Sequence, residues 1–269
     1  MRAFTLASLE IPMKTLVLFA SFALLTSSTQ AQDNGPTVGT LGGRLQKKTE
    51  SLNFRYLVFS PKEKSERPLP LLIFLHGAGG VGEDIRRIQG QPMRVWRGIK
   101  KFGKGPCIVV APQCLRTTKE GQRGVWIPED LNLLLKHLKA MLPVDDKRIY
   151  LTGNSMGGYG AWVWGGHNPE HFAAIAPVVG GIGRGGPKNV TPDLETWAAN
   201  LAQVPVHAFV GAKDKVVPPE RSERMIGAIQ KAGGTRAKLR VYPNEGHGAG
   251  RIVFSTAEFY DWMFSKKRD

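Results

Sequence analysis

Short apolar runs alternate with amphipathic stretches through most of this chain. The runs at 71–75, 107–111 and 173–179 are almost wholly apolar, which is typical of strands buried on both faces of a parallel sheet. Strands are expected at 52–59, 71–75, 107–111, 148–152, 173–179, 206–210 and 239–242. Because helical patterns separate most of these strands, the sequence predicts βαβ units and an α/β fold with a mostly parallel central sheet flanked by helices.

The amphipathic stretches predict the helices between these strands. The stretch at 130–141 brings a row of apolar side chains onto one helical face, formed by Leu131, Leu134, Leu135, Leu138 and Met141. The stretch at 84–100 predicts a mostly helical segment whose middle is broken by Pro92. Further helices are expected at 197–201, 220–232 and 256–264.

The N-terminal segment has the pattern of a secretory signal. Lys14 precedes the apolar stretch 15–26, and the small residues Thr29 and Ala31 occupy the −3 and −1 positions of a cleavage site. The apolar stretch is shorter than the roughly 20 residues that a transmembrane helix needs. We therefore expect 1–31 to be a signal peptide, 32–50 a flexible, polar lead-in, and 51–269 a single α/β domain.

This signal predicts a secreted or periplasmic protein with no stable membrane insertion after cleavage. Met13 is an alternative start of the chain, which would make 1–12 an upstream extension. An uncleaved membrane anchor is the alternative interpretation of the apolar stretch.

The composition is that of a soluble globular protein, with 42% hydrophobic and 22% charged residues in a chain of 269. The net charge of +15 favours contact with anionic partners, but the lysines and arginines are scattered and form no stripe interleaved with aromatic residues. A nucleic-acid partner is therefore not expected. Attraction to acidic polymers or to envelope surfaces remains open.

Cys107 and Cys114 flank an apolar run that is expected to be extended. At about 3.3 Å per residue they would lie roughly 20 Å apart, far beyond the reach of a disulfide. They are expected to be reduced, largely buried thiols. No spacing of side chains in the sequence resembles a metal site, and no cofactor is implied.

The stretch Ile-Tyr-Leu-Thr-Gly-Asn-Ser-Met-Gly-Gly-Tyr-Gly at 149–160 is the most informative in the chain. A short strand runs into Gly153-x-Ser155-x-Gly157 and a helix rich in small residues follows, which is the pattern of a nucleophile elbow. The glycines avoid Cβ clashes in so tight a turn, and the helix N-terminus favours a developing oxyanion at the serine. Ser155 is therefore the predicted nucleophile.

Two residues downstream follow strands in the order that this kind of catalytic triad requires, which is serine, then acid, then histidine. Functional groups in such sheets gather at the carboxyl ends of the strands. We therefore predict Asp214 as the acid and His247 as the base that takes the proton of Ser155. Glu245 and Asp193 are the alternative acids.

An oxyanion hole needs two backbone donors. We predict the N–H of Met156, which follows the nucleophile, and the N–H of Ala78 in the turn after the apolar strand, with Gly79 as the neighbouring candidate. His76 in that turn is expected to be structural rather than a base. Trp126 is a candidate substrate-binding residue on the acyl or leaving-group side, and packing in the core is the alternative.

Five motifs in this order resemble the predicted peptidase or carboxylesterase branch of the α/β hydrolases. They are Leu-Leu-Ile-Phe-Leu-His-Gly-Ala-Gly-Gly at 71–80, Ala-Pro-Gln-Cys at 111–114, Gly-Asn-Ser-Met-Gly-Gly-Tyr-Gly at 153–160, Val-Gly-Ala-Lys-Asp at 210–214 and Gly-His at 246–247. The related families are the phospholipase/carboxylesterase, dienelactone hydrolase-like and polyhydroxybutyrate depolymerase-like hydrolases. One departure follows His247, where this chain has Arg251 and many relatives carry an acidic or aromatic residue.

The resemblance implies a serine hydrolase that acts on carboxylic esters, either short acyl esters or acyl groups linked to polysaccharides. We expect an exported serine esterase with little or no cap, because only about residues 178–203 could form a lid. A serine peptidase of the same fold is one alternative. A catalytically retired envelope binding protein is the other, and the intact order of Ser155, Asp214 and His247 argues against it.

Overall fold

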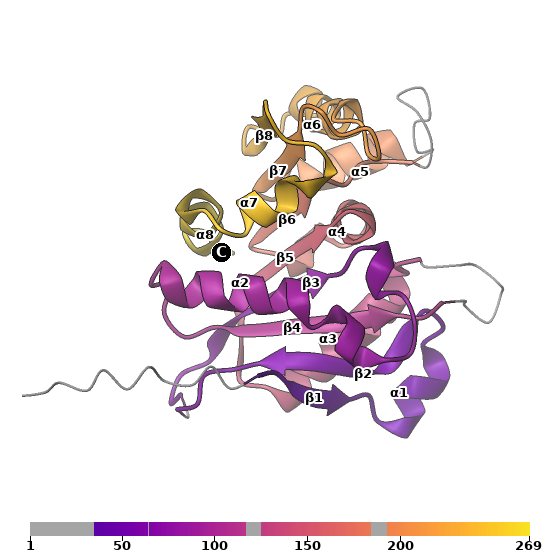
Figure 1. The fold of residues 1–269 in the computed structure, drawn as a ribbon, viewed down its shortest axis with the longest axis vertical. Helices are drawn as coiled ribbons and strands as arrows, with labels where there is room; N and C mark the ends of the chain where they lie inside the picture. Colours follow the sequence, from indigo (N-terminus) through magenta and orange to yellow (C-terminus); the bar gives the residue numbers. More distant parts are fainter. Residues whose placement is uncertain (1–34, 64, 117–124, 184–192) are drawn as a thin grey trace, which may run out of the picture. The chain divides into compact units, whose positions relative to one another are not determined.

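The computed structural model describes residues 35–63, 65–116, 125–183 and 193–269, and Gly35–Asp269 form one compact unit (Figure 1). The predicted signal peptide and the first residues of the predicted lead-in lie outside the described residues. So do 184–192, in the segment considered for a lid. The described part of that segment includes α5 (Leu194–Leu201), which packs against α4 (Met156–His167) and α6 (Glu220–Lys231).

An eight-stranded sheet forms the centre of this unit, in the order β1-β2-β4-β3-β5-β6-β7-β8. The strands are β1 (Thr37–Thr40), β2 (Leu52–Phe59), β3 (Leu69–Leu75), β4 (Ile108–Cys114), β5 (Val144–Asn154), β6 (Ala174–Val178), β7 (Val206–Gly211) and β8 (Ala237–Tyr242). β2 pairs antiparallel with β1 and β4, and the other pairings are parallel. The sheet is therefore mostly parallel, as predicted. Strands β3, β4, β6 and β7 are buried along their whole length, which explains their almost wholly apolar sequences.

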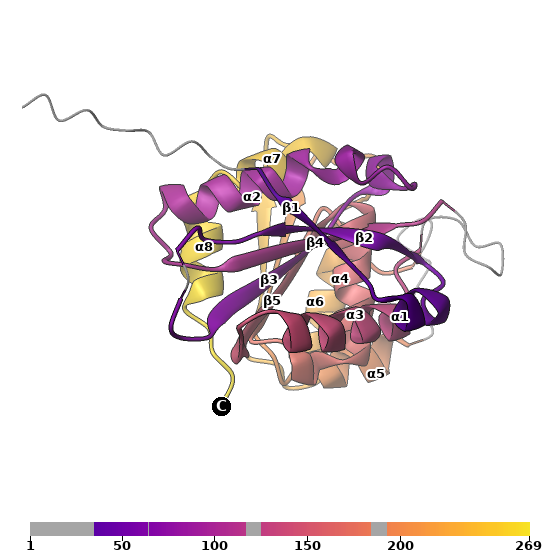
Figure 2. The same ribbon diagram turned by 90° about the horizontal axis from the view of Figure 1, so that it is seen from below.

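Helices cover both faces of the sheet (Figure 2). On one face lie α3 (Pro128–Met141), α4, α5 and α6, and on the other lie α2 (Gly90–Lys101), α7 (Gly250–Val253) and α8 (Ala257–Phe264). The remaining helix is α1 (Gly43–Lys48), and the short 3-10 helices are η1 (Ala78–Gly80), η2 (Ile85–Ile88), η3 (Pro169–His171) and η4 (His247–Ala249). Among the described residues, no helix is long and apolar enough to cross a membrane.

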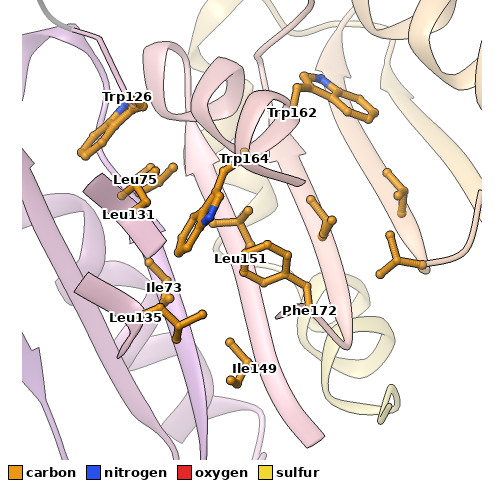
Figure 3. Packing of buried hydrophobic residues seen from close by; sticks show 14 of the residues in the cluster. Ile73, Leu75, Trp126, Leu131, Leu135, Ile149, Leu151, Trp162, Trp164 and Phe172 are labelled. Carbon is orange, nitrogen blue, oxygen red and sulfur yellow. The ribbon is translucent and has the colours of Figure 1, made fainter. Parts of the chain in front are cut away.

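Each face of the sheet has its own hydrophobic core. On the α4 face, Trp164 packs edge to face against Phe172 with 4.9 Å between ring centroids, beside Leu151 of β5 (Figure 3). On the opposite face, Phe259 of α8 packs edge to face against Phe254 and Tyr260. These two cores hold the strands firmly, so the loops at their carboxyl ends start from fixed positions.

Residues 37–48 correct one expectation, because they form β1 and α1 rather than part of a flexible lead-in. β1 pairs with β2, and Leu41 after it is 4% exposed. Gly39 lies against the ring of Tyr56, where a Cβ atom would come within 2.3 Å of the ring. The polar, glycine-rich composition concealed this strand, because its position depends on pairing with β2 and not on an apolar pattern of its own.

Two details of the predicted helices were also wrong. Pro92 is the third residue of α2, within the first turn, where its missing N–H costs no helical hydrogen bond. The proline therefore lies at the start of a helix that follows the separate turn η2. Met141 is 66% exposed at the end of α3, so the buried row of that helix ends at Leu138.

The two cysteines are buried and free, as predicted. Cys107 immediately precedes β4 and Cys114 is its last residue, so the extended strand separates them. Burial raises the pKa of both thiols, to about 12 for Cys114, which keeps them protonated at neutral pH.

Candidate active site

Ser155 lies in the turn between β5 and α4, at the carboxyl edge of the sheet. Its backbone has φ 58° and ψ −116°, in the region that residues with a side chain rarely adopt. Its N–H donates to the carbonyl of Val178 at 3.0 Å, and its own carbonyl accepts from Tyr159 at 3.0 Å. This strained, well-anchored turn places the Ser155 hydroxyl within hydrogen-bond distance of His247, as in a nucleophile elbow.

The two flanking glycines are required by close backbone contacts. A Cβ atom on Gly153 would lie 2.2 Å from the carbonyl oxygen of Gly157. A Cβ atom on Gly157 would lie 1.9 Å from the carbonyl oxygen of Leu75 in β3. The spacing Gly-x-Ser-x-Gly therefore follows from how closely α4 approaches β3 and β5.

Ser155, His247 and Asp214 form one continuous hydrogen-bonded chain. The hydroxyl Oγ of Ser155 lies 2.8 Å from Nε2 of His247. Nδ1 of the same ring lies 2.8 Å from Oδ2 of Asp214. The three side chains come from different parts of the sequence, and the structure brings them together with the geometry that a nucleophile, a base and an orienting acid need.

The carboxylate of Asp214 is fixed on both of its oxygens. Oδ1 accepts hydrogen bonds from the backbone N–H groups of Val216 and Val217, both at 2.9 Å, while Oδ2 faces His247. The Asp214 side chain is 1% exposed, whereas the His247 ring is 29% exposed. The acid is therefore enclosed and oriented, and the imidazole stays accessible from the open side of the site.

The loops after β7 and β8 are joined by their backbones. The N–H of Lys213 donates to the carbonyl of Glu245 at 2.8 Å, and Gly211 lies so close to Gly246 that a Cβ atom would be 2.4 Å from its carbonyl oxygen. These contacts set the distance between Asp214 and His247. Neither alternative acid orients the imidazole: Asp193 is exposed, and among the described residues no hydrogen bond joins the side chain of Glu245 to His247.

The predicted oxyanion donors belong to two elements that lie next to Ser155. Met156 is the first residue of α4, where its N–H has no helical acceptor. Ala78 begins η1 directly after Gly77, and a Cβ atom on Gly77 would lie 3.4 Å from the Cβ of Ser155. Neither the Met156 nor the Ala78 N–H donates to another backbone or side-chain group among the described residues. Two free donors beside Ser155 are what a tetrahedral oxyanion requires.

Trp126 lies in the hydrophobic core beside the site. It is 7% exposed, packs edge to face against His76 with 4.9 Å between ring centroids, and lies beside Leu75 (Figure 3). Gly160 of α4 allows this packing, because a Cβ atom there would be 2.6 Å from the indole. The structure therefore gives Trp126 the packing position that the sequence left as the alternative.

A cavity of about 380 Å³ opens beside the elbow, between α2 and α7. Its volume falls in the range of roughly 300–1,000 Å³ that is usual for small-molecule sites. The lining residues are His76, Gly79, Gly80, Arg87, Ile88, Gly90, Gln91, Arg94, Asn154, Gly250, Arg251 and Phe254. Of these, Asn154 directly precedes the predicted nucleophile and Gly79 belongs to the predicted oxyanion turn.

Three arginines give this cavity a positive charge. Arg87 comes from η2, Arg94 from α2 and Arg251 from α7. None of them forms an ion pair with a carboxylate that the structure describes. In the sequence only Arg251 stood out, as a departure from the pattern of the related families, because the meeting of the three arginines depends on how α2 and α7 pack. No group of three or more possible metal ligands occurs among the described residues.

The dienelactone hydrolase family model matches residues 112–251, more than half of the chain. The chain belongs to the dienelactone hydrolase family. Ser155, Asp214 and His247 all lie within the matched segment. The family is one of those that the sequence motifs resembled.

Curated relatives match over most of their length. A Salmonella typhimurium protein named "Putative carboxymethylenebutenolidase" is 32% identical over 214 residues, which cover 70% of this chain and 71% of that protein. An Aspergillus terreus protein named "Probable feruloyl esterase C" is 24% identical over 231 residues, which cover 84% of this chain and 78% of that protein. The membership makes the chain a hydrolase of this family.

Solved structures share the fold. The crystal structure of a thermostable esterase has a TM-score of 0.70 and 25% identity, over 88% of this chain and 64% of that chain. A ferulic acid esterase has a TM-score of 0.64 and 18% identity, over 86% of this chain and 96% of that chain. The fold is therefore the α/β-hydrolase fold, as the motifs predicted.

Proposed function

We propose that this protein is an exported serine hydrolase that cleaves carboxylic esters through an acyl-enzyme. The observation that carries the proposal is the hydrogen-bonded chain from Ser155 through His247 to Asp214, with 2.8 Å at each link to the imidazole. The strained backbone of Ser155 and the membership of a hydrolase family support the same conclusion.

In this mechanism the Oγ of Ser155 attacks the ester carbonyl carbon, and Nε2 of His247 takes the hydroxyl proton. Asp214 holds the imidazole in the tautomer with a proton on Nδ1 and stabilises the imidazolium. The alcohol leaves with the proton from Nε2, and a bond between Ser155 and the acyl group remains. A water molecule, deprotonated by the same imidazole, then attacks the acyl carbon. The bond between the acyl group and Oγ breaks, the imidazolium returns the proton to Oγ of Ser155, and the acid is released.

Negative charge develops on the carbonyl oxygen during both attacks. The N–H groups of Met156 and Ala78 are the donors for this oxyanion, since both residues begin elements beside Ser155 and both N–H groups lack another acceptor among the described residues. Removing one such donor from a serine hydrolase typically costs about 10²–10³ in kcat.

The substrates we propose are short acyl esters or acyl groups linked to polysaccharides. The name of the Aspergillus terreus relative and that of the ferulic acid esterase point to feruloyl esters as one group to test. The names of the carboxymethylenebutenolidase relatives point to lactone-type substrates as another.

A direct test measures hydrolysis of p-nitrophenyl acetate, p-nitrophenyl butyrate, methyl ferulate and a peptide p-nitroanilide by the purified protein and by His247→Ala. We expect turnover of at least one ester that falls by about 10³-fold or more in the variant. Faster cleavage of the anilide than of every ester would favour the peptidase alternative. Equal ester turnover in both proteins would overturn the proposed base.

The three arginines of the cavity favour esters that carry a negative charge. Arg251→Ala should lower kcat/KM for mono-p-nitrophenyl succinate, which has a free carboxylate, and leave p-nitrophenyl acetate unchanged. Arg44→Ala, at an exposed position of α1, is the matched control. Because the charges are exposed, the preference should weaken as salt is added. A uniform loss on both esters would contradict this part of the proposal.

Export is proposed from the signal pattern at 1–31. When the complete chain is expressed in a secreting bacterial host, the exported protein should begin at Gln32. Leu18→Arg, which places a charge in the apolar stretch, should block export. A product that keeps residues 1–31 and remains in the membrane fraction would support the anchor alternative instead.

A further inference from the structure

His76 follows β3 directly and connects the predicted oxyanion turn to the neighbouring strand. The side chain is buried, with 2% of its surface exposed. Its Nδ1 lies 2.7 Å from the carbonyl oxygen of Gly77, and its Nε2 lies 2.9 Å from the backbone nitrogen of Cys114 at the end of β4. The ring therefore bridges the start of the turn and β4.

The chemistry of these two partners determines the position of the ring proton. A backbone N–H can only donate, so Nε2 must accept from Cys114 and carry no proton. Nδ1 then carries the proton and donates to the Gly77 carbonyl. Burial lowers the pKa of His76 to about 4, against a smaller opposite effect of the Gly77 hydrogen bond, so the ring is neutral at pH 7.

The carbonyl of Gly77 and the N–H of Ala78 belong to the same peptide group. A trans peptide is planar, and its C=O and N–H point in opposite directions. A hydrogen bond that fixes the Gly77 carbonyl on the His76 side therefore directs the Ala78 N–H to the other side. A Cβ atom on Gly77 would lie 3.4 Å from the Cβ of Ser155, so this peptide group lies beside the predicted nucleophile.

Other contacts of the turn fit this arrangement. The N–H of Gly80 also donates to the Gly77 carbonyl, at 2.9 Å. Gly80 must be a glycine here, because a Cβ atom would lie 2.5 Å from Nδ1 of His76. Gln113 of β4 donates to the Gly80 carbonyl at 2.9 Å and accepts from Asn53 at 2.7 Å. The last two residues of β4, Gln113 and Cys114, thus hold the turn through Gly80 and His76.

We propose that His76 is a positioning residue for catalysis, whose Nδ1–H holds the Gly77–Ala78 peptide so that the Ala78 N–H faces the oxyanion formed at Ser155. The inference rests on the proposed serine hydrolase mechanism. It gives His76 a role in the rate of the chemical step, beyond its contribution to packing.

Two substitutions separate the two hydrogen bonds of the ring. In His76→Asn the amide nitrogen can replace Nδ1 and donate to Gly77, while the contact with Cys114 is lost. In His76→Gln the amide oxygen can replace Nε2 and accept from Cys114, while the donor to Gly77 is lost. His76→Phe keeps the shape of the ring and loses both.

The matched control is His207 of β7, another buried histidine whose pKa burial lowers to about 4. It packs against Phe209 and Trp262, with ring centroids 4.2 and 5.1 Å away, and has no hydrogen-bond partner on Nδ1. The same three substitutions at His207 therefore report what the loss of a buried histidine does to stability alone.

The experiment measures kcat and KM for p-nitrophenyl acetate per active site titrated with a fluorophosphonate, together with the thermal midpoint of every variant. We expect kcat of His76→Phe and His76→Gln to fall by about 10²-fold with little change in KM, as for the loss of an oxyanion donor. His76→Asn should recover at least tenfold of that loss, on the scale of about 1.4 kcal/mol. The His207 variants should lose stability and keep their kcat.

Two results would overturn the inference. One is a kcat of His76→Gln within about threefold of the wild type, and the other is an equal fall in the His76 and His207 series. If His76→Phe does not fold, the Asn and Gln variants still decide, because each keeps one hydrogen bond. A wild-type protein without Ser155-dependent turnover would overturn the proposed function as well, so the two failures are distinguishable.

Discussion

Oδ2 of Asp214 lies 2.8 Å from Nδ1 of His247, and the other oxygen of the same carboxylate accepts two backbone N–H groups at 2.9 Å. The carboxylate is thus held in one orientation by the loop that follows β7. The imidazole can hydrogen-bond to this carboxylate only by donating a proton from Nδ1, which leaves Nε2 free to accept the proton of Ser155. This relationship makes a specific prediction about the acid.

Asp214→Asn should remove most of the activity without unfolding the protein. The amide oxygen can accept from Val216 and Val217, so the NH₂ group must face His247 and force the opposite tautomer. That tautomer directs a proton at Ser155, and kcat should fall by about 10⁴-fold, as in other serine hydrolases with this substitution. Steady-state kinetics and a thermal melt measure both effects.

Glu245→Gln is the control for this prediction, since Glu245 was the neighbouring alternative acid. Its kcat should stay close to that of the wild type. Loss of activity in Glu245→Gln together with an active Asp214→Asn protein would assign the acid to Glu245.

Gly157→Ala should destabilise the protein strongly. A Cβ atom at this position would lie 1.9 Å from the carbonyl oxygen of Leu75, so either α4 or β3 has to move. Overpacking of this kind typically costs about 1–3 kcal/mol, and backbone contacts leave less room to relax than side chains do. Urea denaturation with activity measured on the folded fraction tests the prediction.

Gly227→Ala is the matched control on the exposed side of α6, where a Cβ atom meets nothing within 4 Å. Alanine in a helix interior is more favourable than glycine by about 0.5–1 kcal/mol, so this variant should be slightly stabilised. Equal unfolding free energies for the two variants would mean that the elbow is less tightly packed than the structure indicates.

The sequence predicted the residues whose roles depend on local chain geometry. Gly153 and Gly157 mark the elbow because no side chain fits there, and this is visible in the spacing alone. Asp214 and His247 could be chosen because each follows a strand, and parallel strands bring their carboxyl ends to one edge. The hydrogen bonds of Ser155 and Asp214 to the His247 imidazole then fitted the predicted order.

Features that depend on contacts between distant segments could not be predicted in the same way. β1 was missed because a polar edge strand is defined by its pairing with β2. Arg87, Arg94 and Arg251 were missed as a group because they come from three elements that meet only when α2 and α7 pack. Trp126 was a candidate for either substrate binding or packing, because no local pattern separates an aromatic side chain in a pocket from one in the core.

Stability should fall as the pH is lowered from about 6.5 to about 4. Burial lowers the pKa of His76 and of His207 to about 4, below the ordinary histidine value of about 6.5 that applies to the unfolded chain. Between these pH values the unfolded chain binds protons that the folded protein does not, and this favours unfolding. Partial burial lowers the pKa of His171 too, so its contribution has the same sign.

Urea denaturation at several values from about pH 7.5 to about pH 5.5 measures this dependence, because aspartate and glutamate side chains bind protons mostly below that range. His207→Phe should make the dependence shallower, because one of the buried neutral rings is gone. Stability that stays constant or rises on acidification would contradict the neutral, buried state of these histidines.

The central claim is that Ser155 is an activated nucleophile, and covalent labelling tests it most directly. The folded protein is treated with a fluorophosphonate, digested and analysed by mass spectrometry. The Ser155→Ala variant is treated in the same way, after its secondary-structure content has been shown to match that of the wild type. We predict one equivalent of label on the peptide that contains Ser155, no label in the variant, and a kcat for ester hydrolysis lower by about 10⁴-fold or more in the variant. A folded wild type that takes no label, or a variant that keeps most of its turnover, would contradict the account.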